Sequence, residues 1–327
     1  MIVEFTVHES FDILSHLADD LKVAVVENKL VLPTWLGNGY VKKIDLGREF
    51  KFVLHQYTLA EDFLLKRLPS SEENRMLSIV FNSLEIPSAP SPDQQEAIAF
   101  LQSNSSAIQI SSSSFGTQSF FPSGSKVYFA VIGIDSAFLK SILQIEKCND
   151  LLKTILEFRQ PFFYHERMTS DILHLIQLLA EADERNELLH FFYKLKIQEL
   201  LYLLFGKLLR RSANAYGSIT NDELAKLYEI RLSIISDFGK PPRLSELARS
   251  FGMSETKMKR LFRQIFGDSI YNYFQTARME QAAILLKQTS LSVSEIGFEL
   301  GFINLSHFSR LFERFYGMTP KKYISAG

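Results

Sequence analysis

Two short stretches near the C-terminus carry side chains that donate hydrogen bonds at helical spacing. In the first they are Thr256, Lys257, Lys259, Arg260 and Arg263, and in the second they are Ser306, His307, Ser309, Arg310 and Arg314. Hydroxyl, imidazole and basic groups suit phosphate oxygens and the edges of nucleic-acid bases, and a guanidinium can contact two acceptors at once. For either stretch alone, a solvated basic face on a helical bundle would be the simpler interpretation.

The two stretches belong to an internal repeat, which covers residues 244–267 and 293–317. Each copy has Ser, Glu and Leu or Ile at its second to fourth positions, continues to a glycine, and has Arg-Leu-Phe before a second glycine at its end. Gly252 and Gly301 fall where a helix ends with positive φ, and Ser254 and Asn304 are natural caps for the helix that follows. The pattern predicts two helix-turn-helix units, in which the second helix of each enters the major groove of DNA.

The apolar residues of the repeat form inner faces for these helices. The expected core positions are Leu244, Leu247, Ala248, Phe251, Met258, Leu261, Phe262 and Ile265 in the first copy, and Ile296, Gly297, Leu300, Phe308, Leu311, Phe312 and Phe315 in the second. Residues 270–286 form a connecting helix of roughly 25 Å at about 1.5 Å per residue. Such a helix can place the two units on neighbouring turns of DNA, about 34 Å apart.

The C-terminal third of the chain resembles the AraC/XylS family. The resemblance rests on residues 244–267, on ARMEQAAILL at 277–286, and on the segment with HFSRLFER and FYGMTP that ends near Tyr323. It implies an all-helical domain whose second helices contact the operator, with base-reading roles for Thr256, Lys259, Arg260, Ser306, His307 and Arg310. With the helix caps and flanking cations, the predicted DNA-contacting residues are Ser254, Thr256, Lys257, Lys259, Arg260, Arg263, Asn304, Ser306, His307 and Arg310. The N-terminal part resembles the pyochelin-responsive subgroup only in the spacing of FVLHQY and PFFYHERMT.

Length and composition predict a folded protein of two domains, and the strand and helix patterns along the chain predict the α+β class. The chain has 327 residues, of which 46% are hydrophobic and 22% charged, as in folded proteins of more than one domain. From residue 240 onward, 13 Lys and Arg face 7 Asp and Glu, whereas the whole chain has a net charge of −1. A basic end on an acidic body is typical of a polyanion-binding module joined to another domain.

Cysteine content and hydropathy predict a cytoplasmic protein without a membrane segment. Cys148 is the single cysteine, which excludes an intrachain disulfide and a cysteine-based zinc site and fits a reducing compartment. The first twenty residues lack a basic region followed by an apolar run, so we expect no signal peptide. The most apolar stretch, residues 200–209, is about half the length that spans a bilayer.

Hydrophobic patterning predicts how the domains are arranged. Residues 1–211 are expected to form an effector-binding and dimerisation domain, 212–221 a linker, and 222–327 the DNA-binding domain. Strands are predicted at 49–58, 75–81, 107–111 and 126–134, and helices from 136 to 211. The stripe of Ile197, Leu201, Leu204 and Leu208 either packs on the strands or forms a dimer interface. Aromatic candidates for an effector pocket are Phe52, Tyr57, Phe120, Phe121, Tyr128 and Phe129, although plain core is the alternative for each.

The function predicted from these features is a sequence-specific DNA-binding transcription regulator controlled by a small effector. Its expected partners are double-stranded DNA, a second copy of the chain and RNA polymerase, with no cofactor, metal or catalytic residue. Two alternatives stay open, a DNA-binding protein without a ligand and an enzyme fused to a DNA-binding tail. A repair methyltransferase of that kind needs several cysteines, and a metal-dependent cupin-like enzyme needs clustered histidines, whereas the seven histidines here are scattered without an HxH pair.

Overall fold

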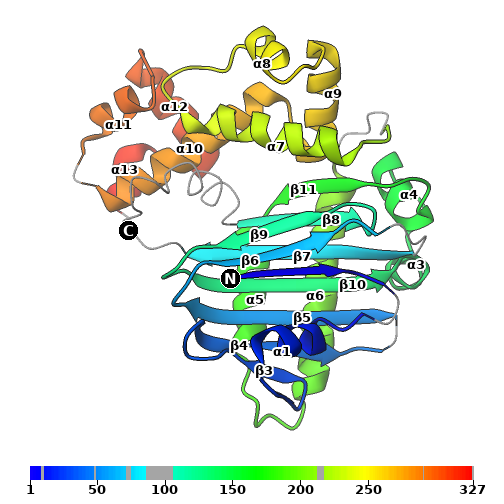
Figure 1. Ribbon diagram of the computed structural model, residues 1–327. Coiled ribbons are helices and arrows are strands. Elements are labelled where there is room, and N and C mark those ends of the chain that lie inside the picture. The colour runs from blue at the N-terminus through cyan, green and yellow to red at the C-terminus, as the bar shows by residue number, and fades with distance from the viewer. Residues whose placement is uncertain are drawn as a thin grey trace. The chain divides into compact units, whose positions relative to one another are not determined.

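The computed structural model describes residues 1–8, 11–47, 49–70, 75–85, 106–211, 217–289 and 291–325 (Figure 1). The chain divides into two compact units, Met1–Asn221 and Asp222–Gly327. The first unit is built from strands with helices beside them and the second from helices, so the predicted α+β class is confirmed. Residues 212–216 of the expected linker lie outside the described residues. No helix in the described ranges is long and apolar enough to cross a membrane.

The strands of the first unit form two sheets within the described residues. The larger has eight strands in the order β11-β8-β7-β10-β5-β4-β3-β2, and the smaller has three in the order β1-β6-β9. The strand pairs among the described residues are antiparallel except for β1 with β6. The bounds are β1 Ile2–Thr6, β2 Val25–Val26, β3 Lys29–Val31, β4 Gly37–Asp45, β5 Phe50–Leu59, β6 Phe63–Leu68, β7 Met76–Glu85, β8 Ser106–Ser112, β9 Thr117–Phe121, β10 Lys126–Asp135 and β11 Phe163–Arg167.

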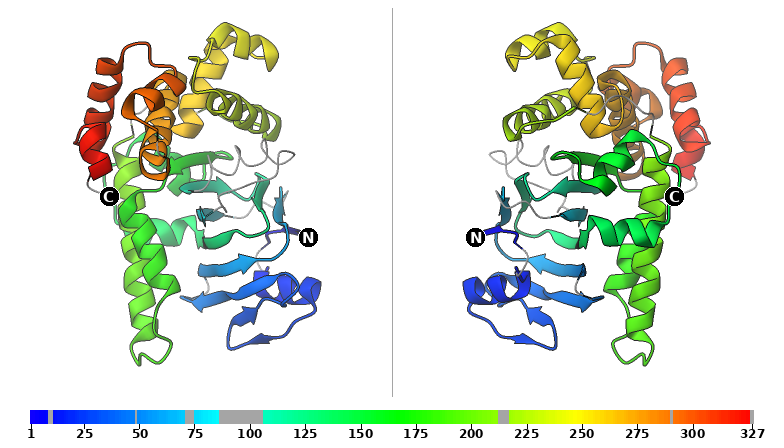
Figure 2. Two further views of the ribbon diagram at one scale, coloured as in Figure 1. Left: turned by 90° about the vertical axis from the view of Figure 1, so that its left-hand side faces the viewer. Right: turned by 90° about the vertical axis from the view of Figure 1, so that its right-hand side faces the viewer.

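Both faces of the larger sheet are covered, so its central strands are apolar on both sides. Side chains alternate along a strand, and on β5 Phe52 and Leu54 belong to one apolar cluster while Val53 and Tyr57 belong to another. The first cluster includes the helices α3 Ser136–Leu143, α4 Asp150–Glu157, α5 Ser170–Ala180 and α6 Leu189–Leu209. The second includes the smaller sheet and the helix α1 Ile13–Leu21. Figure 2 shows α5 and α6 on one side of the strands and α1 on the other.

The predicted strands at 49–58, 75–81, 107–111 and 126–134 are confirmed as β5, β7, β8 and β10. The zone 136–211 was expected to be helical throughout, and in that respect the prediction is wrong, because β11 lies inside it. Four consecutive residues of β11, from Phe163 to Glu166, are buried. An unbroken buried run shows no period of two, so the sequence pattern does not distinguish this strand from a buried helix.

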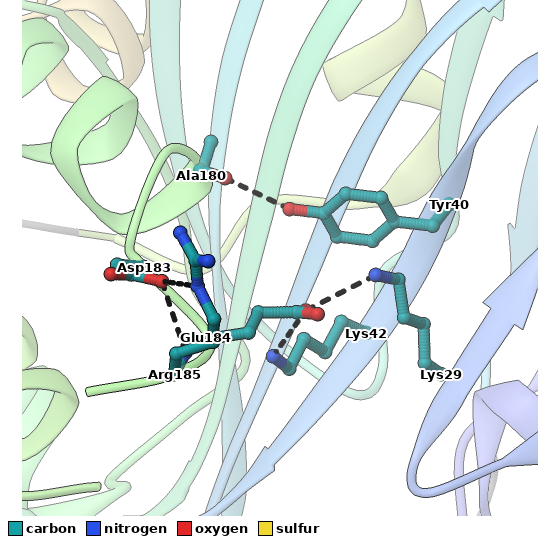
Figure 3. A network of polar contacts seen from close by, with 7 residues as sticks. All are labelled: Lys29, Tyr40, Lys42, Ala180, Asp183, Glu184 and Arg185. Carbon is teal, nitrogen blue, oxygen red and sulfur yellow. Dashed lines mark hydrogen bonds and ion pairs between the residues drawn. The ribbon is translucent and has the colours of Figure 1, made fainter. Parts of the chain in front are cut away.

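The loop between α5 and α6 is tied to the edge of the larger sheet by polar contacts (Figure 3). Glu184 accepts hydrogen bonds from Lys29 at 3.1 Å and from Lys42 at 2.9 Å. The hydroxyl of Tyr40 donates to the carbonyl of Ala180 at 2.9 Å. The lysine contacts, that from Lys42 first, lower the pKa of the Glu184 carboxyl. Because Glu184 is half-exposed, each ion pair adds little stability, and apolar packing of α6 is the larger contribution.

The helix α6 has one face in the core of the first unit. Ile197, Leu201, Leu204 and Leu208 are each at most 1% exposed and pack on α4, α5 and the sheet. The two interpretations of this stripe are therefore resolved in favour of packing on the strand domain. These four side chains are not available to a second copy of the chain.

We predict that neighbouring substitutions on α6 differ sharply in their effect on stability. Leu201→Ala removes a buried side chain and should lower the free energy of unfolding by about 2–5 kcal/mol. Tyr202→Ala, at a position 74% exposed, should change it by less than about 0.5 kcal/mol. Urea unfolding of the full chain, at a concentration where it is monomeric, measures both. Equal losses for the two variants would contradict this assignment of the buried face.

Candidate nucleic-acid interface

The first helix-turn-helix unit is formed by α8 Leu244–Ser250 and α9 Glu255–Phe266, which follow α7 Asn221–Ser236. Gly252 lies between the two helices with φ +61°, as the sequence predicts. The Ser254 hydroxyl then accepts the backbone N–H of Lys257 at 3.3 Å and caps α9. Met258, Leu261 and Phe262 are fully buried below it. These contacts fix which side of α9 faces outward.

The outer face of α9 is basic, and part of its charge is already paired within the unit. The exposed residues are Thr256, Lys257, Lys259, Arg260 and Arg263. The ammonium of Lys257 lies 2.6 Å from Glu223 of α7, and Lys259 pairs with Glu255 one turn earlier. Contact of either lysine with a phosphate would compete with these partly exposed pairs, which are individually weak.

The second unit is formed by α11 Val293–Glu299 and α12 Leu305–Tyr316. Ser292 and Glu295 form a capping box at the start of α11, and these hydrogen bonds lower the pKa of Glu295. Gly301 has φ +74°, and Asn304 caps α12 by accepting the N–H of His307 at 3.1 Å. Gly297 is buried, and a Cβ at this position would lie 2.6 Å from Leu305 Cδ2. The small residue thus allows α12 to approach α11 closely.

The outer face of α12 differs from that of α9. Ser306, His307 and Arg310 are exposed, and Arg310 Nε donates to the Ser306 carbonyl at 3.3 Å. Ser309, which was expected on this face, is only partly exposed. Near the end of the helix the expected core residue Phe315 is 42% exposed, so that prediction is wrong. The inner position of the last turn is taken instead by Tyr316, which stacks on Phe312 and contacts Tyr323.

Two buried arginines, which the sequence pattern did not single out, hold the helices in place. Arg278, on α10 Ile270–Gln288, donates through Nε to the carbonyl of Leu300 and lies 3.7 Å from the centroid of the Phe302 ring. Burial lowers the pKa of its guanidinium. In the first unit Arg231 donates to the hydroxyl of Tyr273 and lies among aromatic rings. An arginine amid aromatic residues was the signal that could have identified both.

The six aromatic residues predicted to line an effector pocket are divided between the two faces of the larger sheet. Phe52 and Tyr128 belong to the cluster beneath α5 and α6, whereas Tyr57, Phe120, Phe121 and Phe129 lie in or beside the cluster of the smaller sheet. A cavity of about 130 Å³ opens on this second side, and of the six only Phe129 lines it within the described residues. Across the same described ranges, no group of three or more His, Cys, Asp or Glu could hold a metal ion.

We predict that the two turn glycines differ in their tolerance of alanine. At Gly252 a Cβ would meet nothing within 4 Å, so the cost is that of positive φ, about 1–2 kcal/mol. At Gly301 the Cβ would also lie 2.2 Å from the carbonyl oxygen of Gly239, so the backbone must shift. Hydrogen exchange of the full chain should show larger loss of protection in α11 and α12 for Gly301→Ala than in α8 and α9 for Gly252→Ala. The reverse order would contradict the prediction.

Comparison with known proteins gives a family match for the second unit. A helix-turn-helix domain model matches residues 247–326. The virulence regulon transcriptional activator VirF of Yersinia enterocolitica is 30% identical over 45% of this chain and 54% of its own length, and the msm operon regulatory protein of Streptococcus mutans is 25% identical over 54% and 63%. A solved AraC-type transcriptional regulator from Chromobacterium violaceum is 28% identical over 32% of this chain and 95% of its own, with a TM-score of 0.30. The chain thus spans little more than half the length of these curated relatives, and the matched helix-turn-helix domain lies within its second unit, which is similar to the AraC/XylS family.

Proposed function

We propose that this chain is a sequence-specific DNA-binding transcription regulator. The observation that carries the proposal is the pair of helix-turn-helix units, each with an exposed face of hydrogen-bond donors on its second helix. These helices, α9 and α12, have the form that enters the major groove. A helix-turn-helix domain model matches this region, and several relatives of the chain are named as transcriptional activators or operon regulators. The cytoplasm is the expected compartment for such a regulator, and RNA polymerase is the partner that it would meet at a promoter.

The two faces suggest a division of roles on DNA. Lys257, Lys259, Arg260 and Arg263 give the α9 face a dense positive charge, which favours phosphate contact regardless of sequence. The α12 face mixes a hydroxyl, an imidazole and Arg310, a combination suited to a defined set of base edges. Arg310 can pair with guanine through two hydrogen bonds. Arg260 occupies the matching place on α9 and is the remaining candidate for a base contact there.

We further propose that two copies associate through the outer side of α6. Leu188, Phe191, Leu195, Tyr202 and Leu209 are between 40% and 74% exposed and follow one another at intervals of three, four, seven and seven residues. That spacing matches the apolar seam of a coiled coil and lies opposite the buried stripe of the same helix. A stripe on a 21-residue helix can meet its own copy about a two-fold axis. This seam replaces the buried set around Leu201 as the candidate interface.

The first unit is proposed to be the effector-binding part of the regulator. It contains the cavity of about 130 Å³ that opens between the smaller sheet, α1 and the larger sheet. Effector control through this cavity distinguishes the proposal from the ligand-independent alternative, and the proposed chain acts by binding, without catalysis. Footprinting of the purified chain on DNA upstream of its own gene tests the proposed function directly. Absence of protection on that DNA and on a genomic fragment library would overturn it.

We predict that Arg310→Ala and Lys257→Ala affect DNA binding differently. Arg310→Ala should weaken binding to the cognate site by about 1–3 kcal/mol and relax the preference at one base pair. Lys257→Ala should weaken cognate and random DNA alike and reduce the slope of log K against log salt by about one. Binding titrations at several salt concentrations measure both effects. Equal losses on cognate and random DNA for Arg310→Ala would show that α12 is not the base-reading helix.

We also predict that the dimer depends on the exposed seam of α6. Leu195→Asp places a charge in the seam and should raise the dimer dissociation constant at least about tenfold, a change of about 1.4 kcal/mol. Lys194→Asp alters the charge of the adjacent exposed position outside the seam and should have little effect. Sedimentation of the full chain over a concentration series measures both constants. A chain that stays monomeric at micromolar concentration would contradict the proposed interface.

A further inference from the structure

The cavity of the first unit is lined by apolar residues together with charged, imidazole and hydroxyl side chains. Leu65 of β6, Val80 of β7 and Phe129 and Val131 of β10 supply apolar surface. The volume of about 130 Å³ is close to that of engineered apolar cavities, about 150 Å³, that bind a single aromatic ring. A ligand of this size with an apolar body would therefore fit the space.

Arg67 is the buried charged group in this cavity whose hydrogen-bonding capacity is not fully used. It occupies the last inward position of β6, after the apolar inward residues Phe63 and Leu65, and is only 5% exposed. Its Nη2 donates to the Ser111 hydroxyl at 2.7 Å and to the Phe115 carbonyl at 2.9 Å, whereas its Nε has no hydrogen-bond partner. Among the described residues no carboxylate forms an ion pair with it. A buried cation with a free donor is costly unless an anion compensates it.

The neighbouring polar groups narrow the chemistry of that anion. Lys43 already pairs with Asp12 at 2.7 Å, and Lys51 donates to the Phe11 carbonyl. His55 is 1% exposed, its Nδ1 has no partner, and burial lowers its pKa to about 3, so it is neutral near pH 7. Burial also lowers the pKa of Arg67 to about 10, which leaves the guanidinium charged. The site thus offers a buried guanidinium with an unpartnered Nε beside apolar side chains, which matches one anionic group on an apolar body.

We propose that this cavity binds a small apolar monocarboxylate whose carboxylate is held by Arg67. The proposal rests on the proposed function only in taking the first unit as the effector-binding part. The carboxylate accepts from Nε of Arg67, which forms a charge-assisted hydrogen bond, while the apolar body lies against Leu65, Val80 and Phe129. His55, as a neutral imidazole, can offer a second hydrogen bond to the ligand without adding charge.

The same arginine connects the cavity to the end of the first unit. The Phe115 carbonyl that Arg67 holds lies in the loop between β8 and β9, and Ser113 and Thr117 of this segment line the cavity. In that loop Gly116 N–H donates to Oδ1 of Asn221 at 3.3 Å, and Nδ2 of Asn221 donates to the Ser114 carbonyl at 3.2 Å. Asn221 is the last residue of the first unit and the first residue of α7. A ligand that forms a hydrogen bond with Arg67 can therefore displace the loop whose backbone is hydrogen-bonded to the Asn221 side chain.

Calorimetric titration of the full chain with matched acids and amides tests the site. Phenylacetate and hexanoate should bind at least about tenfold more tightly than phenylacetamide and hexanamide, since only the acids carry the negative charge that compensates the Arg67 guanidinium. Arg67→Met should abolish this preference, and Arg67→Lys should keep part of it. Equal affinity of acids and amides, or no binding of the acids at millimolar concentration, would overturn the proposal.

A second pair of variants keeps the test valid if Arg67→Met does not fold. A Cβ at Gly133 would lie 3.8 Å from its nearest neighbours, Lys51 Cβ and Met76 Cε, so Gly133→Ala fits without strain. Gly133 lines the cavity, and Gly133→Leu should fill part of it and weaken acid binding at least about tenfold, while Gly133→Ala leaves it near wild type. Undiminished binding by Gly133→Leu would place the ligand elsewhere and overturn the proposal.

DNA titration with and without the acid separates this inference from the proposed function. In Asn221→Ala the acid should still bind by calorimetry, but its effect on DNA affinity should be lost, whereas the wild type shows a shift. Acid binding without any DNA binding would overturn the proposed function and leave the carboxylate site standing. DNA binding without acid binding would do the opposite, and an unchanged acid effect in Asn221→Ala would overturn the path through the loop.

Discussion

The exposed face of α12 depends on the contact between Arg278 and the turn that precedes this helix. The guanidinium donates to the carbonyl of Leu300, the last residue before Gly301, and lies on the ring of Phe302, the first residue after it. Both sides of the turn are thus held from α10. Positive φ at Gly301, together with the absence of a Cβ beside the Gly239 carbonyl, allows the chain to reverse there. If this contact shifted, the exposed face of α12 would change its direction relative to α10.

The helical unit was predictable from the sequence because its determinants are local. Turn glycines, caps and apolar spacing all lie within a few residues of the feature that they specify, and the repeat shows each of them twice. The failures are also informative. Phe315 follows the apolar spacing of α12 but is exposed, because Tyr316 fills the inner position on Tyr323, a contact with a separate helix that local spacing does not reveal. The strands β5, β7, β8 and β10 were predictable for the same local reason.

The smaller sheet was not predictable, because its order depends on pairing between distant segments. β1 pairs with β6, and β6 with β9, across fifty or more residues in each case. Arg67 illustrates the consequence for the site. In FLLKRL it follows a lysine and reads as a solvated position, yet the register places Arg67 inward and Lys66 outward. The aromatic residues chosen from composition were largely core, whereas the polar lining of the cavity came from residues without a sequence signal.

The helix α6 shows why apolar content alone does not assign a surface. It is apolar on opposite sides, and one side is required by the core of the first unit while the other is exposed. A second copy on the exposed side would place two first units about a two-fold axis, and two-fold symmetry in the protein is mirrored by paired half-sites in DNA. Each copy already carries two helix-turn-helix units, so a dimer would present four. Because phosphate contacts add to affinity whatever the sequence, sequence selection in such an assembly would come from the mixed donors on α12, and the basic faces of α9 would set how tightly it holds DNA.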